Sequence, residues 1–120
     1  MIIYLDIRYN QLAGLPKGFN NLKALKRLYL GYNSFEVVPD NLQGLIDLFL
    51  IDLTENEINR GVEKLFDISG LTNIYLNHNR LKEFPFELVR KGEIKELNIS
   101  ENFIKDIPSS AYKKIEKLIS

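Results

Sequence analysis

The sequence predicts a repeat solenoid of the α/β class, built from stacked coils that each contribute one short parallel strand. Two observations carry this prediction. Asparagine recurs every 23 residues along the chain, and the apolar residues around each asparagine recur with it. A period of this length is typical of proteins in which each repeat is one structural unit packed on the next. The repeated asparagines are Asn10, Asn33, Asn56, Asn79 and Asn102.

An alternating apolar pair before each asparagine predicts a strand with one buried face. No long helical pattern separates these strands, so they are expected to pair with one another in parallel. The asparagine stands where the chain turns off the strand, and its amide both donates and accepts hydrogen bonds. We therefore expect the five asparagines to form a structural ladder that satisfies backbone groups of adjacent coils. The apolar pairs are Leu5/Ile7, Leu28/Leu30, Ile51/Leu53, Ile74/Leu76 and Leu97/Ile99.

These positions form the pattern L-x-x-L-x-L-x-x-N-x-L, which resembles the leucine-rich-repeat family and is most similar to its 23-residue type with "LP" after the asparagine. The resemblance covers residues 1–120 as a single domain of five repeats. It implies a right-handed curved solenoid with parallel strands on the concave face and 3₁₀ or irregular segments on the convex side. The third repeat has Gly61-Val62 in place of an apolar residue and proline. Its convex arc is therefore expected to differ, as a short helical turn.

The two ends of the chain lead to different expectations. Residues 109–119 predict a C-terminal capping helix, because Tyr112, Ile115 and Leu118 fall at helical spacing after two candidate N-cap serines. No N-terminal cap is expected, since Met1 directly precedes the first coil, and strand one would be a bare edge. A fragment of a longer solenoid, a mature form without its cap and a protomer that pairs edge to edge are all consistent with this start.

Tyrosine gathers at the variable positions around the strands, which the resemblance places on the concave face. Five of the six tyrosines lie there and none of the seven phenylalanines does, so strand preference alone does not explain the enrichment. Tyrosine offers a rigid contact area with a polar tip and is frequent at binding hot spots. We predict a protein-binding surface with an aromatic, basic end and an acidic end. Its residues are Tyr4, Asp6, Arg8, Tyr9, Arg27, Tyr29, Tyr32, Asp52, Glu55, Tyr75, Asn77 and His78.

Composition excludes several other classes of function. Basic and acidic residues number 16 each and neither half of the chain is polarised, which argues against nucleic acid and anionic membranes as partners. The absence of cysteine excludes disulfides and thiolate chemistry. No apolar run is long enough for membrane insertion. The compartment stays open: cytoplasmic, or secreted or surface-exposed if a signal peptide was removed before residue 1.

No catalytic or cofactor site is expected. His78 stands in one column with Glu55 and Glu101, a set that resembles metal ligands, but side chains of a parallel column point side by side and need not converge. Ser100 is one repeat away from His78 without an oxyanion hole beside it. The glycines are scattered through turns and form no phosphate loop. We therefore expect no metal, no cofactor and no enzyme activity.

The resulting hypothesis is a non-catalytic protein-recognition module that binds another protein through the Tyr-rich concave face. The lack of a plant-type or Cys-flanked cap favours a bacterial source, where leucine-rich-repeat modules often serve host interaction or adhesion. The alternative is a structural element that forms homo-oligomers through its uncapped N-terminal edge. The two hypotheses differ in the residues that matter, which are the concave tyrosines in the first and the edge at residues 3–5 in the second.

Overall fold

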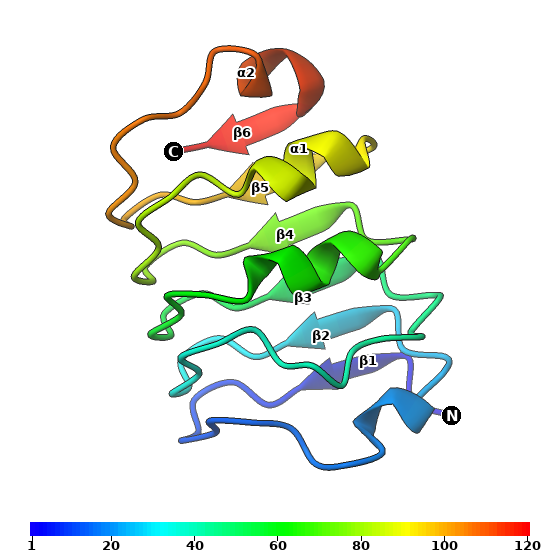
Figure 1. Ribbon diagram of the computed structural model, residues 1–120. Coiled ribbons are helices and arrows are strands. Elements are labelled where there is room, and N and C mark those ends of the chain that lie inside the picture. Colours follow the sequence, from blue (N-terminus) through cyan, green and yellow to red (C-terminus); the bar gives the residue numbers. More distant parts are fainter.

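A single parallel sheet of six short strands, arranged in chain order, runs the length of the molecule (Figure 1). The computed structural model describes residues 1–120, apart from the side chain of residue 89. The predicted solenoid of parallel strands is confirmed. The strands are β1 (Tyr4–Asp6), β2 (Arg27–Tyr29), β3 (Leu50–Asp52), β4 (Asn73–Tyr75), β5 (Glu96–Asn98) and β6 (Lys117–Ile119).

The strand register follows the sequence period. Leu5 pairs with Leu28, and each later strand up to β5 is aligned with its neighbour by the same 23-residue step. The ladder continues beyond the strand ends, where the Leu30 amide donates to the Asp52 carbonyl at 2.8 Å. Equivalent residues therefore form straight columns across the sheet, and every column presents one residue from each coil.

Short helical segments lie along one face of the sheet (Figure 1). The opposite face of the sheet is the outer face. Gly61 precedes one of them with φ of +87°, and a Cβ there would stand 2.7 Å from Val37 Cγ2. The expectation that the third repeat forms a helical turn is confirmed, because a 3₁₀ helix follows this glycine. These segments are η1 (Phe19–Asn21), η2 (Val62–Asp67), α1 (Phe86–Lys91) and α2 (Ala111–Lys114).

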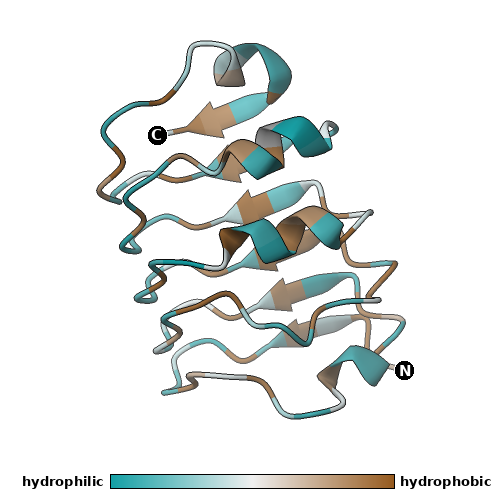
Figure 2. Cartoon of the chain, viewed as in Figure 1, coloured by the Kyte–Doolittle hydropathy of each residue, from teal (hydrophilic) through white to brown (hydrophobic). Residues whose placement is uncertain are grey.

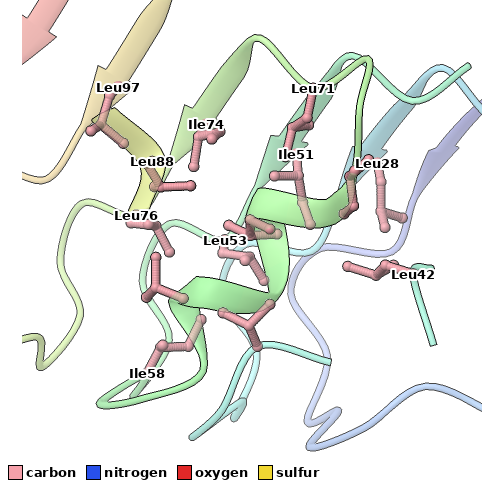
Figure 3. Packing of buried hydrophobic residues seen from close by; sticks show 14 of the residues in the cluster. Leu28, Leu42, Ile51, Leu53, Ile58, Leu71, Ile74, Leu76, Leu88 and Leu97 are labelled. Atoms are coloured by element: carbon pink, nitrogen blue, oxygen red, sulfur yellow. The ribbon is translucent and has the colours of Figure 1, made fainter. Parts of the chain in front are cut away.

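The core lies between the sheet and these helical segments. The central apolar residue of β2 to β5 is fully buried in each strand. Figure 3 shows these side chains meeting leucines of the opposite side, among them Leu88 of α1. The strands have an apolar centre, and in β1, β2, β4 and β5 it lies between more hydrophilic residues (Figure 2). One coil cannot bury its own apolar residues, so stacking produces the dry column on which the fold depends.

The C-terminal end differs from the expected helix over 109–119. Helix α2 has four residues, and the chain then extends into strand β6, in which Leu118 pairs with Leu97. The prediction is therefore wrong beyond Lys114. Ile115 is buried and Leu118 packs against the core, so both residues have the apolar environment that the helical pattern suggested. The chain extends after Ile115, so Leu118 reaches the core as the central residue of an edge strand instead of from a helix face.

Candidate functional site

The repeated asparagines mark the line where each coil leaves the sheet. The Asn56 Nδ2 group donates to three carbonyls, those of Leu53 and Thr54 in its own coil and that of Leu30 in the preceding coil. Its Oδ1 accepts the Phe35 amide at 3.0 Å. Asn33, Asn79 and Asn102 repeat this arrangement with their own neighbours. The bonds join adjacent coils, so they hold the strands of the outer face in register.

Asn10, in the first coil, makes a smaller set of bonds. Its Nδ2 group donates to the Ile7 and Arg8 carbonyls within its own coil. Its side chain is exposed, whereas Asn56 and Asn79 are buried. The asparagine bonds therefore connect coils only where a preceding coil exists in the structure.

The residue before each asparagine has a left-handed backbone. This conformation is uncommon for residues with a side chain and costs free energy at each position. In the first four coils the strain is offset by hydrogen bonding, since the Tyr32 amide donates to the Thr54 carbonyl at 2.8 Å and the amides of Tyr9, Glu55 and His78 make the equivalent bond. A shared backbone conformation also aligns the side chains of this column. The φ angles are +60° at Tyr9, +58° at Tyr32, +55° at Glu55, +58° at His78 and +55° at Glu101.

Aromatic side chains are brought into contact over the first two coils. The rings of Tyr9 and Tyr32 stack with centroids 4.4 Å apart and planes inclined by 15°. Both residues are exposed, at 72% and 42%. The pKa of the Tyr32 hydroxyl is raised. The main cause is repulsion from the charge of the neighbouring Tyr9 hydroxyl, and desolvation by burial is the second cause. The two rings thus present a preordered aromatic surface to solvent.

Two arginines complete the aromatic end of this face. The Arg27 guanidinium lies over the Tyr4 ring at 4.9 Å from the centroid, and over the Phe49 ring at 5.3 Å. Arg8 lies over the Tyr29 ring at 5.3 Å. These are distances at which a cation is attracted to the ring face. The predicted tyrosines and arginines of the first two coils thus make three separate contacts: Tyr9 with Tyr32, Arg8 with Tyr29, and Arg27 with Tyr4.

The remaining predicted residues form smaller groups at the acidic end. His78 Nδ1 lies 3.3 Å from Glu55 Oε1. Asn77 accepts the Thr54 hydroxyl at 3.1 Å. The Tyr75 hydroxyl donates to Glu96 at 2.6 Å, and desolvation together with this bond raises the Tyr75 pKa. Tyr75 is thus held by Glu96 of the next coil.

Three residues outside the predicted set contribute to this face. Phe49 packs on Arg27, Glu96 holds Tyr75, and Thr54 contacts Asn77. Glu96 and Thr54 occupy the same columns as the predicted residues, so the column pattern contained the signal for both. Phe49 lies just before strand β3, outside those columns, and only the three-dimensional contact identifies it.

Several polar groups of this face are hydrogen-bonded to their neighbours. The Ser100 hydroxyl donates to Asn98 Oδ1 at 2.8 Å, which directs it toward the amide of its own strand. Among the described residues, no group of three or more potential ligands is placed to hold a metal ion. Across the same residues, no helix combines the length and apolar character that crossing a bilayer requires.

Comparisons with known proteins agree with the fold. A family model described as a leucine rich repeat matches residues 2–58. Osteomodulin of Bos taurus is 32% identical over 121 residues, covering 98% of this chain and 28% of osteomodulin. An adenylate cyclase of Schizosaccharomyces pombe is 26% identical over 99% of this chain, but the match covers 7% of the cyclase.

A solved structure gives the same result at the level of the fold. A leucine-rich-repeat protein of Leptospira interrogans superposes with a TM-score of 0.74 at 21% identity, over 97% of this chain and 36% of that protein. The chain spans 36% of the Leptospira protein, 28% of osteomodulin and 7% of the cyclase, so it covers only part of the length of each.

Proposed function

Because the chain belongs to the leucine-rich-repeat family, we propose that it is a non-catalytic recognition module that binds another protein through the concave face. Leucine-rich-repeat proteins generally bind other proteins. The concave face is the outer side of the sheet, made by the columns that contain Tyr4, Tyr29 and Tyr32. Host interaction or adhesion in a bacterium stays a prediction of the sequence.

The stacked pair of Tyr9 and Tyr32 is the observation that supports this proposal most strongly. Single exposed aromatic residues are common, but here two exposed rings are stacked in the turns that follow β1 and β2 and form one contiguous aromatic patch. Their order in the free protein lowers the entropy that binding must cost. A face with preordered tyrosines between arginines and carboxylates fits a folded or extended protein partner.

Affinity capture from native and candidate host lysates, scored by mass spectrometry, tests the proposal. The wild type is compared with a variant in which Tyr29, Tyr32 and Tyr75 are all replaced by alanine. The matched control replaces Phe86 and Phe103, two exposed aromatics outside the concave columns, by alanine. Circular dichroism and thermal unfolding establish that each variant is folded.

The proposal expects a partner that the wild type and the phenylalanine control retain and the tyrosine variant loses. Retention by the tyrosine variant and loss by the phenylalanine control would place the binding surface elsewhere and overturn the proposal. If all three capture only further copies of the chain itself, self-association through the N-terminal edge becomes the better account.

A further inference from the structure

On the concave face, the guanidinium group of Arg8 is bound by two other side chains of the same protein. Arg8 Nε donates to Asp6 Oδ1 at 3.0 Å, and Arg8 Nη2 donates to Asp6 Oδ2 at 2.7 Å. The same guanidinium lies over the ring of Tyr29, the strand partner of Asp6 in the next coil. A carboxylate and a neighbouring tyrosine thus form a two-sided receptor, with a bidentate ion pair on one side and a ring on the other.

The same pair of residues recurs two repeats later. Asp52 occupies the column position of Asp6, and Tyr75 is its partner in the next strand, as Tyr29 is for Asp6. The carboxylates are held alike as well. Asp52 Oδ1 accepts the Thr54 amide at 2.9 Å, just as Asp6 Oδ1 accepts the Arg8 amide at 3.1 Å.

The arginine is missing from the second copy. Thr54 stands where the first coil has Arg8, and its hydroxyl is directed to Asn77. Among the residues that the structure describes, no cationic side chain lies within ion-pair distance of Asp52. Tyr75 is half-buried and tied to Glu96, so its ring is already fixed in place.

The charge around this second copy favours a cation. Glu55 lies in the same coil as Asp52 and contacts His78 alone among the charged groups described. Arg8, the cation of the neighbouring part of the face, makes its ion pair with Asp6, although the charge of Asp52 also contributes to the raised pKa of Arg8. A positively charged group that approaches β3 therefore meets a carboxylate with unused hydrogen-bonding capacity and a second carboxylate nearby.

We propose that Asp52 and Tyr75 receive an arginine side chain of the protein partner, in the geometry that Arg8 adopts on Asp6 and Tyr29. This inference rests on the proposed function and specifies the chemistry of its partner. Arginine is preferred to lysine because only a planar guanidinium makes a bidentate contact with the carboxylate while it packs on a ring. The partner is thus a protein segment that presents arginine to the centre of the concave face.

A titration followed by amide nuclear magnetic resonance tests the proposal directly. The probe is an acetylated glycine-arginine-glycine amide, compared with peptides that contain lysine or the neutral isostere citrulline at the central position. The arginine peptide is expected to shift the amides of Asp52, Thr54 and Tyr75 most strongly, the lysine peptide less, and the citrulline peptide little. Equal shifts with arginine and citrulline, or shifts outside this region only, would overturn the proposal.

Two substitutions use the internal copy as a template. Thr54→Arg places a guanidinium where the first coil has one, so it should occupy Asp52 and weaken peptide binding about ten-fold or more. Thr54→Gln, of similar reach but neutral, is the matched control and should keep the peptide shifts. Asp52→Asn removes the carboxylate without a change in shape and should weaken binding to the same extent as Thr54→Arg. Undiminished binding in both Thr54→Arg and Asp52→Asn would contradict the proposal.

The reverse substitution provides an independent measurement. Arg8→Thr frees Asp6 and Tyr29, and it should add a second set of shifts at residues 6–8 and raise the stoichiometry from one peptide to two. Absence of these new shifts would show that the carboxylate and ring are insufficient to bind arginine.

Capture of the partner by the tyrosine variant and by Asp52→Asn distinguishes failure of the arginine receptor from failure of the concave binding surface. A partner that is lost on Tyr29/Tyr32/Tyr75 replacement but retained by Asp52→Asn leaves the concave face as the binding surface and refutes the arginine receptor. A partner retained by both variants refutes the concave face itself. Loss in both, together with arginine-specific peptide shifts, supports both statements.

Discussion

The inner and outer sides of the same strands differ in how much they change from coil to coil. On the inner side, Asn33, Asn56, Asn79 and Asn102 make the same bonds to the same backbone groups. On the outer side, each column changes its residue type at nearly every coil. The residues that repeat from coil to coil hold the coils together, whereas the residues that differ determine which groups the outer face presents to a partner.

The inner side is expected to show the largest effect on stability. Asn56→Ala leaves the buried Phe35 amide without its acceptor, while the Leu30 and Leu53 carbonyls each keep one donor, from Asn33 and Asn79. It should lower the free energy of unfolding by about 1–3 kcal/mol. Asn10→Ala, the matched control in the first coil, removes only exposed local bonds and should cost less than about 1 kcal/mol. Chemical denaturation measures both. Equal losses at the two positions would break the distinction between bonds that join coils and bonds within one coil.

The backbone of the helical side gives the next largest effect. Gly61→Ala combines a left-handed backbone with a Cβ 2.7 Å from Val37, and it should destabilise the protein by about 1–3 kcal/mol. Gly92 also has positive φ, but among the described residues no atom would lie within 4 Å of a Cβ at this position. Gly92→Ala should therefore show the backbone strain alone, at about 1 kcal/mol. If thermal unfolding shows the two variants to be equally stable, the close packing at Val37 does not contribute.

The outer face should respond in the opposite way. Tyr9→Ala removes one ring of an exposed stack, so the free energy of unfolding should fall by less than about 1 kcal/mol. Binding of a captured partner should weaken by about ten-fold, measured by surface plasmon resonance. Tyr112→Ala removes an exposed tyrosine outside the columns and should leave binding unchanged. A large loss of stability with unchanged binding for Tyr9→Ala would assign the stack to the fold instead of the function.

The smallest expected effect concerns the ion pair of the first coil. The hydrogen bonds that Asp6 accepts from the Arg8 side chain and backbone hold the pKa of the Asp6 carboxyl below its usual value. The stability that this pair contributes is therefore present above about pH 3.9 and is lost as the pH falls through the lower folded-state pKa. In Arg8→Gln, the Asp6 titration followed by carbon-detected nuclear magnetic resonance should move back toward the usual range. An unchanged titration midpoint would show that Arg8 does not hold this carboxylate in solution.

Much of the inner side could be predicted from the sequence because its cause is periodic. The alternation of Leu28 with Leu30, repeated at the same spacing in every coil, fixes both the strand and the direction of its pairing. The last strand could not be predicted in this way. The step from Leu97 to Leu118 is shorter than the repeat, no asparagine follows, and the spacing of Tyr112, Ile115 and Leu118 is that of a helix.

The outer face could be located but not resolved from the sequence. Columns place Tyr9 beside Tyr32, yet the left-handed backbone at both residues has no signal in their side chains, since glycine and asparagine are the usual residues there. The ion pair of Asp6 with Arg8 depends on which way each side chain turns at the end of the strand. Side-chain contacts of this kind depend on three-dimensional geometry, which the spacing of residues along the sequence does not determine.

Amide hydrogen exchange of the protein with and without its captured partner tests the division between the two sides most directly. The account predicts added protection on binding at residues 4–9, 27–32, 50–55 and 73–78, with unchanged exchange in η2 and α1. Protection concentrated in η2 and α1, with the outer strand face unchanged, would contradict it.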